Sequence, residues 1–313
     1  MLPWILLALL PLLLFLFGDS LLRFACARRE LPEGWEEEWI AEMGGDAWRD
    51  AARAGREWLA RRETEEAEVQ SEDGFLLHAL LVPHVAPRAT AILFHGWRSS
   101  WELDFLPALP FLYSLGLQLL LVDERAQGDS EGQWITLGVR ERADVSTWTE
   151  YVAGRFGEKH PIFLMGSSMG AAAVLLAAAD PLAGSVRGIV ADSGYVSPYE
   201  AASTIWRNRT PFPARFAMWL LDRFARLFAG FDLRGADASE ALGKTERAVL
   251  FLHGTRDATV PSYFSKRACE ACGSEATLVL VEGAGHCMSY LTDRERVEAA
   301  LRAFVDKRLQ YGQ

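Results

Sequence analysis

The chain has 313 residues, and half of them are hydrophobic, so it can bury one large core or two smaller ones. It carries 32 basic and 42 acidic residues, a formal net charge of -10. An acidic protein repels phosphate backbones, so the composition argues against nucleic acid as a partner.

The first 18 residues, MLPWILLALLPLLLFLFG, carry no charged side chain. A helix of this length lies at the short end of what crosses a bilayer, and we interpret residues 1–18 as an uncleaved transmembrane anchor. Arginines follow at Arg23, Arg28 and Arg29. By the positive-inside rule the protein would then be a single-pass protein of the cell membrane with its body on the cytoplasmic side. The alternative is a signal segment cleaved near Ala25-Cys26-Ala27 and a secreted protein.

Residues 19–64 predict a connector followed by an amphipathic helix. The connector is mixed and acidic, and the helical pattern covers residues 46–62. One face of this helix is shared by Trp48, Ala51, Ala52, Gly55, Trp58 and Leu59, whereas arginines occupy the opposite face. We expect the helix to pack on the following domain rather than to lie in a membrane.

Residues 65–313 alternate between short apolar runs and stretches long enough for helices. EVQSEDGFLLHALLV predicts two strands around a turn, and the later apolar runs suit strands that are buried on both faces. The pattern predicts an α/β domain with a mostly parallel eight-stranded sheet, an antiparallel hairpin at its start and helices on both faces. The six later strands are expected at residues 89–96, 117–124, 161–166, 188–194, 248–254 and 276–283.

The connection between Gly194 and Ala248, about fifty residues, is too long for a simple crossover. We interpret it as a crossover helix plus a small helical cap inserted at about residues 197–243. Within it, apolar side chains from Phe216 to Phe228 recur at helical spacing. They predict a stripe packed on the sheet or, as the functional alternative, an apolar wall for an acyl or aryl group. The candidate substrate-binding residues are Trp206, Phe212 and Phe216.

The apolar run 161–166 ends in Gly166-Ser167-Ser168-Met169-Gly170, a match to G-x-S-x-G. A serine at a tight strand-to-helix turn has strained backbone angles and needs small neighbours two positions away. The following helix directs its N-terminal N–H groups at the serine oxygen and favours negative charge there. Ser168 is therefore the candidate nucleophile.

A serine hydroxyl needs a base to take its proton and a carboxylate to orient that base. Asp257 follows the predicted strand 248–254, and His286 follows the predicted strand 276–283. Both would lie at the carboxyl edge of the parallel sheet beside Ser168. Asp192 also ends a predicted strand and is the alternative acid.

These motifs resemble those of the α/β-hydrolase superfamily. FHGW, DERAQGDSEG, GSSMG, HGTRDATVP and GAGH occur in the family's order over about residues 65–310. The chain is most similar to bacterial, N-terminally membrane-anchored serine hydrolases related to the dienelactone hydrolase and serine aminopeptidase groups. The family often has Gly-His where this chain has Ala126-Gln127, a departure that bears on substrate range.

The resemblance implies an oxyanion hole made by the N–H groups of Met169 and Trp97, each able to lower the barrier by about 3 kcal/mol. It implies a serine hydrolase that cleaves carboxylic esters, with lipid-derived esters favoured by the anchor. An amide or peptide hydrolase and an acyltransferase would use the same three residues. A membrane-tethered binding module without activity is the non-enzymatic alternative.

We expect no metal and no cofactor. The remaining histidines have no partner at ligand spacing, and Cys269 and Cys272 form a single C-x-x-C pair that predicts two thiols on a helix. The expected partners are a small-molecule ester and the membrane, and the sequence leaves the oligomeric state open.

Overall fold

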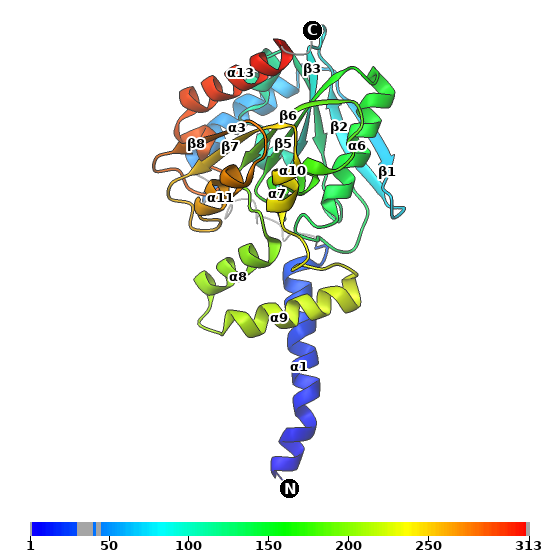
Figure 1. The fold of residues 1–313 in the computed structure, drawn as a ribbon, viewed down its shortest axis with the longest axis vertical. Coiled ribbons are helices and arrows are strands. Elements are labelled where there is room, and N and C mark those ends of the chain that lie inside the picture. Colours follow the sequence, from blue (N-terminus) through cyan, green and yellow to red (C-terminus); the bar gives the residue numbers. More distant parts are fainter. Residues whose placement is uncertain (1, 30–39, 42–44, 311–313) are drawn as a thin grey trace.

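The computed structural model describes residues 2–29, 40–41 and 45–310. Its centre is one eight-stranded sheet in the order β1-β2-β4-β3-β5-β6-β7-β8, in which only the pairs β1–β2 and β2–β4 are antiparallel (Figure 1). The predicted fold class is therefore confirmed. The strands are β1 (Glu65–Gln70), β2 (Leu76–Val82), β3 (Ala89–Phe94), β4 (Leu117–Val122), β5 (Pro161–Ser167), β6 (Ser185–Asp192), β7 (Ala248–Gly254) and β8 (Ala276–Val281).

The central strands are buried on both faces, which explains their continuous apolar sequence. One strand begins earlier than its apolar run predicts. β6 starts at Ser185 instead of residue 188, because Ser185 and Val186 pair with Pro161 and Ile162 of β5. Pairing with a neighbouring strand thus extends β6 through polar residues.

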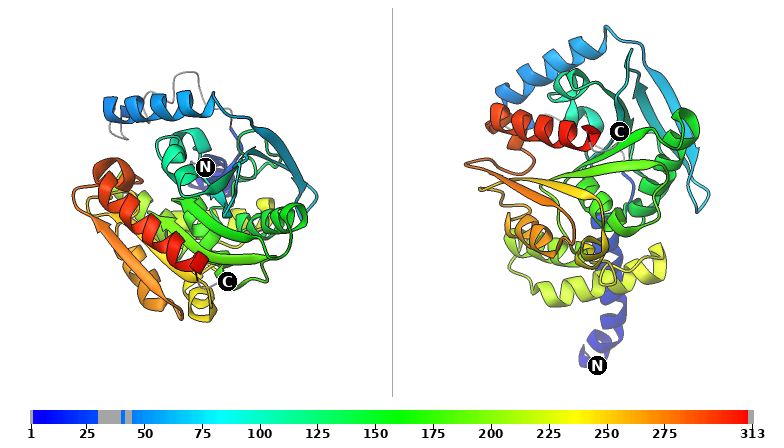
Figure 2. Two further views of the ribbon diagram at one scale, coloured as in Figure 1. Left: turned by 90° about the horizontal axis from the view of Figure 1, so that it is seen from above. Right: turned by 45° about the horizontal axis from the view of Figure 1, so that its top comes forward.

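Helices cover both faces of the sheet (Figure 2). One face packs on α6 (Glu141–Phe156), α7 (Met169–Leu176), α10 (Ala238–Lys244) and α11 (Tyr263–Ala271). The other face packs on α3 (Asp46–Leu59), α4 (Trp101–Phe105), α5 (Leu109–Ser114) and α13 (Arg294–Gln310).

Helix α3 docks on this second layer through its apolar face, as we expected from the sequence. Trp48 is buried and its Nε1 donates to the carbonyl of Leu103 at 3.1 Å. A Cβ at Gly55 would lie only 2.1 Å from the carbonyl oxygen of Leu106. Glycine at this position allows the helix to approach α4 closely.

The N-terminal helix α1 (Leu2–Cys26) continues well beyond residue 18. Its last turns are buried through Leu21, Leu22 and Cys26 in a cluster with the cap. The cap consists of α8 (Pro198–Arg209), α9 (Ala214–Phe224) and a π-helical turn at Ala225–Ala229. In Figure 1, α9 lies across α1 below the sheet, and the N-terminal part of α1 extends beyond the cap.

The stripe from Phe216 to Phe228 does not pack on the sheet, which corrects our interpretation. Its buried members, Leu220 and Phe224, pack against α1. Phe216, Trp219, Leu227 and Phe228 are exposed on the outer side of the cap. The apolar residues do recur at helical spacing, as predicted, but they pack on the N-terminal helix.

Replacing Gly55 by alanine should destabilise the protein by about 1–3 kcal/mol, because the new methyl group overlaps the Leu106 carbonyl. The matched control is Gly154→Ala in α6, where nothing lies within 4 Å of the added Cβ. The control should be stabilising by up to about 1 kcal/mol from helix propensity. Urea unfolding in detergent measures both, and an equal response of the two variants would contradict the close docking of α3.

Candidate active site

Ser168 occupies the turn between β5 and α7 with φ 50° and ψ -108°, a conformation that side-chain-bearing residues rarely adopt. A Cβ at Gly166 would lie 2.4 Å from the backbone of Gly170. A Cβ at Gly170 would lie 2.1 Å from the carbonyl oxygen of Phe94. Close backbone approach thus requires both glycines of the motif.

The structure brings together the three side chains that the sequence selects. His286 Nε2 lies 2.9 Å from Ser168 Oγ, and His286 Nδ1 lies 2.7 Å from Asp257 Oδ2. Ser168 follows β5, Asp257 follows β7 and His286 follows β8, so all three meet at the carboxyl edge of the sheet. The imidazole bridges the hydroxyl and the carboxylate.

Asp257 is fixed by contacts to both of its oxygens. Oδ1 accepts hydrogen bonds from the N–H groups of Thr259 and Val260 at 2.9 and 2.8 Å. Oδ2 faces His286 and also lies 3.2 Å from Nε2 of the fully buried His253. Burial raises the pKa of Asp257, but hydrogen bonds and charge from His253 and His286 outweigh it and lower the pKa to about 2.

His253 thus holds the acid in place. Its Nδ1 lies 2.7 Å from Ser265 Oγ, and its Nε2 lies 2.7 Å from the carbonyl oxygen of Val260. A carbonyl only accepts, so Nε2 carries the hydrogen and also points it toward Asp257. Nothing in the sequence indicated its contact with the triad acid, because His253 lies on β7 and not in the loop that carries Asp257.

Asp192, the alternative acid, holds the loop that carries His286. Its Oδ1 accepts from the hydroxyls of Ser193 and Ser289 at 3.0 and 3.1 Å. Ser193 Oγ accepts in turn from the N–H of Cys287, the residue after His286, at 3.1 Å. Burial raises the pKa of Asp192. The sequence did not identify this network, because its members come from different loops.

The loop after β3 is clamped beside Ser168. Asp104 accepts hydrogen bonds from the Gly96 N–H at 2.7 Å and from the Ser99 hydroxyl at 2.6 Å. A Cβ at Gly96 would lie 3.3 Å from the Ser168 Cβ, so the loop backbone runs close to the nucleophile. The N–H groups of Trp97 and Met169 donate to no acceptor within the described part of the chain, which leaves them available to a ligand.

Gln127, at the position of the departure from the family pattern, braces this loop. Its Oε1 accepts from the Arg98 N–H at 2.5 Å, and Ala126 takes a φ of 59°. The side chains of Ala126, Ile135 and Met169 form a small buried apolar cluster beside the nucleophile. The sequence did not single out Ile135, whose side chain is buried in this cluster.

The end of α1 is attached to two loops, the one after β3 and the one after β4. Trp97 Nε1 donates to the carbonyl of Ala25 at 2.8 Å, and the Ile135 N–H donates to the carbonyl of Cys26 at 2.6 Å. Arg28 bonds to the carbonyls of Gly128 and Ser130. The last turn of the N-terminal helix is therefore part of the frame around Ser168.

The structure places the three predicted substrate-binding residues on the outer cap. Trp206 Nε1 donates to the carbonyl of Phe212 at 2.9 Å, Phe212 packs edge-on against Phe17 of α1, and Phe216 packs against Trp219. Within the described residues, no ring contact or hydrogen bond joins these three side chains to the triad.

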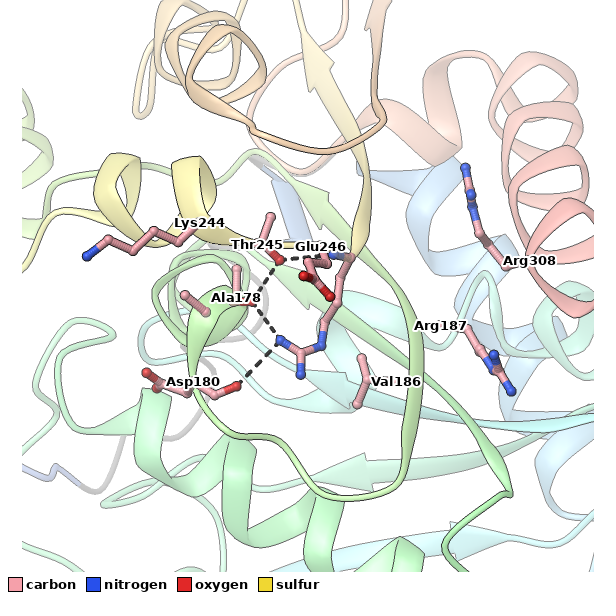
Figure 3. A pocket seen from close by; sticks show the side chains of 10 residues that line it. Ala178, Asp180, Val186, Arg187, Lys244, Thr245, Glu246 and Arg308 are labelled. Atoms are coloured by element: carbon pink, nitrogen blue, oxygen red, sulfur yellow. Dashed lines mark hydrogen bonds between the residues drawn. The ribbon is translucent and has the colours of Figure 1, made fainter. Parts of the chain in front are cut away.

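A cavity of about 560 Å³ lies elsewhere, at the amino edge of the sheet (Figure 3). Its lining comes from the 3-10 turn and loop after α7, the start of β6 and the segment before β7, and it includes Asp180, Arg187 and Arg247. Arg247 is bound to the carbonyls of Ala178 and Asp180. The carboxyl edge with Ser168 is the opposite edge, so this cavity is separate from the triad. No group of three or more potential metal ligands occurs within the described residues.

The alpha/beta hydrolase family matches residues 91–300, and the chain belongs to this family. Over 226 residues it is 26% identical to the uncharacterized protein YqkD of Bacillus subtilis (strain 168), covering 72% of this chain and 73% of that protein.

Solved structures with similar folds include esterases. A Pyrococcus furiosus esterase has a TM-score of 0.63 at 21% identity, covering 79% of this chain and 93% of its own. Est1E of Butyrivibrio proteoclasticus, with ferulic acid bound, has a TM-score of 0.61 at 20% identity, covering 78% and 99%. These likenesses establish the fold.

The lowered pKa of Asp257 predicts a loss of stability in acid. Because the folded state favours the ionised carboxylate, its contribution is complete above the ordinary value of 3.8 and disappears as the pH falls through about 2. The contribution is roughly 2 kcal/mol. Urea unfolding gives the free energies of unfolding of the wild type and of Asp257→Asn, which cannot titrate. The difference between these two free energies should therefore be roughly 2 kcal/mol smaller at about pH 2 than at about pH 5. A constant difference would contradict the assignment.

Proposed function

We propose that this protein is a membrane-anchored serine hydrolase that cleaves carboxylic esters through an acyl-enzyme. The observation that carries the proposal is the hydrogen-bonded chain from Asp257 Oδ2 through His286 to Ser168 Oγ, with distances of 2.7 and 2.9 Å. This arrangement activates a serine hydroxyl, because a fixed imidazole can take its proton.

In the first half-reaction, Ser168 Oγ attacks the acyl carbonyl carbon while His286 Nε2 takes the hydroxyl proton. Asp257 stabilises the imidazolium, and its position on Nδ1 keeps Nε2 free to act as the base. The tetrahedral intermediate collapses when His286 gives the proton to the leaving alkoxide. Water then loses a proton to His286 and attacks the acyl-enzyme, which releases the acid and restores the Ser168 hydroxyl.

The oxyanion would be held by the N–H groups of Met169 and Trp97. Met169 is the first residue of α7, so its N–H has no partner within the helix. The helix N-terminus adds a positive dipole end at the same place.

Esters are the favoured substrate class because similar structures include the Pyrococcus furiosus esterase and Est1E with ferulic acid bound. Lipid-derived esters are the proposed subset. The residues beside the nucleophile are apolar, and α1 contains a stretch, Leu9–Cys26, long and apolar enough to cross a membrane.

An uncleaved α1 fits the contacts better than a cleaved signal segment. Cleavage near Ala25-Cys26-Ala27 would remove the buried side chains of Leu22 and Cys26 and the carbonyl that accepts from Trp97. We propose a single-pass membrane protein, with the body on the cytoplasmic side as the arginines after the apolar run favour.

A fluorophosphonate probe, which reacts with activated serines, should label the wild-type protein. In a separate assay, the unlabelled wild-type protein should hydrolyse a medium-chain ester. Ser168→Ala should abolish both. Ser167→Ala is the matched control, since its hydroxyl is buried and bonds to the Cys287 thiol rather than to His286. Folded wild-type protein that is neither labelled nor active would support a binding module instead.

Trp97→Phe should lower kcat by up to about tenfold with a smaller change in KM, because loss of the bond to Ala25 loosens the loop that carries the oxyanion donor. Trp101→Phe is the control. Its ring packs in the adjoining core, and its indole makes no hydrogen bond within the described residues. Steady-state ester hydrolysis compares the two, and equal kcat values would exclude a role for the Trp97 bond.

A further inference from the structure

The outer side of the cap carries an unusual apolar surface. We call Phe212, Phe216, Trp219, Leu227 and Phe228 the cap rim. Trp219 is 48% exposed, Leu227 70% and Phe228 53%. Two groups of ring contacts join the rim to α1. Phe212, which also contacts Phe216, packs against Phe17, and Phe228 packs against Phe15. The surface is thus continuous with the exposed leucines of α1.

The position of the rim along α1 fixes its depth relative to a membrane. Among the described residues, ring contacts with the cap begin at Phe15. The candidate membrane span within α1, Leu9–Cys26, includes both Phe15 and Phe17. If this span crosses a bilayer, the level of Phe15 and Phe17 must therefore lie at or below the lipid interface.

The orientation of α9 agrees with this depth. In Figure 1, α9 lies across α1, so it would run along the membrane plane when α1 stands upright. Gly18 permits the crossing, because a Cβ there would lie 2.3 Å from the ring of Phe224. An amphipathic helix with aromatic residues on its outer side is typical of helices that lie in an interface.

The charge of the cap is opposite to that of the whole protein. The cap helices, residues 198–229, contain five arginines and two acidic residues, Glu200 and Asp222, although the chain has a net charge of -10. All five arginines are exposed. Arg209, Arg215 and Arg223 form no ion pair within the described part of the chain, and Arg226 pairs with Asp222. Clustered arginines beside an aromatic surface match an anionic lipid headgroup layer.

We propose that the cap is a second membrane-binding element, in which the cap rim enters the interface of an anionic bilayer and the cap arginines bind lipid phosphates. The protein is then held by α1 and the cap together, with α9 in the plane of the interface. This docking does not depend on chemistry at Ser168.

The test measures the depth of the cap in the full-length protein reconstituted into vesicles. An environment-sensitive fluorophore is placed on Trp219→Cys in a background with Cys269→Ser and Cys272→Ser. The matched position is Val85→Cys, which is 95% exposed in the β2–β3 connection at the other edge of the sheet. Lipids with a nitroxide near the headgroup should quench the label at position 219 severalfold more strongly than the label at position 85.

The anionic part of the proposal is tested by charge reversal. Arg209→Glu, Arg215→Glu and Arg223→Glu together should reduce quenching at position 219 in phosphatidylglycerol vesicles toward the level of position 85. The matched triple variant reverses Arg53, Arg56 and Arg61, which are exposed on or beside α3, and should leave quenching unchanged.

Three outcomes would overturn the proposal. Equal lipid quenching at positions 219 and 85 would place the cap in water. Protection of position 219 from both lipid and aqueous quenchers, increasing with protein density, would mean that a second copy covers the rim. Unchanged lipid quenching at position 219 after charge reversal of the cap arginines would show that these arginines do not bind anionic lipid.

Discussion

The hydrogen bond between Asp257 Oδ2 and His286 Nδ1, 2.7 Å long, is the contact on which the arrangement of the site depends. It joins two loops that follow neighbouring strands, β7 and β8, and it sets which nitrogen of the imidazole faces Ser168. Different neighbouring residues hold Asp257 and the loop of His286 in place. Thr259, Val260 and His253 fix the carboxylate, whereas Asp192 acts through Ser193 and Ser289 on the loop of His286. Each buried polar group in this network has a partner, as burial of such groups requires.

The N-terminal helix, which is long and apolar enough to cross a membrane, also packs into the domain. Its last turn accepts hydrogen bonds from the indole of Trp97 and from the N–H of Ile135, so the loops after β3 and β4 both pack on it. The cap reaches the other side of the site, where Asn208 Nδ2 donates to the carbonyl of Ala258, next to Asp257. The two elements proposed to contact lipid therefore also border the triad. A substrate that partitions into the interface would therefore reach the site beside these two elements, which is a physical reason to favour lipid-derived esters.

Local signals carried much of the fold. Alternating or apolar runs that end in glycine or charge predicted the eight strands. The G-x-S-x-G spacing predicted the tight turn, because the close packing around Ser168 requires glycines at fixed positions in the local sequence. The start of β6 at Ser185 was not visible, since strand pairing and not hydrophobicity recruits its first residues. The partner of the Phe216–Phe228 stripe was also not visible: a helical period shows that one face is apolar, but not whether a sheet, a second helix or lipid covers it.

The sequence by itself determined the strand–helix alternation, the nucleophile turn and the placement of Ser168, His286 and two candidate acids after strands of the sheet, because backbone sterics and the topology of a parallel sheet limit where such residues can lie. Only the tertiary structure decided between Asp257 and Asp192, brought His253 to the triad acid and attached α1 to the loop of Trp97. These contacts join residues far apart in the chain. Their distances depend on how separate loops pack together, and one-dimensional patterns do not encode that packing.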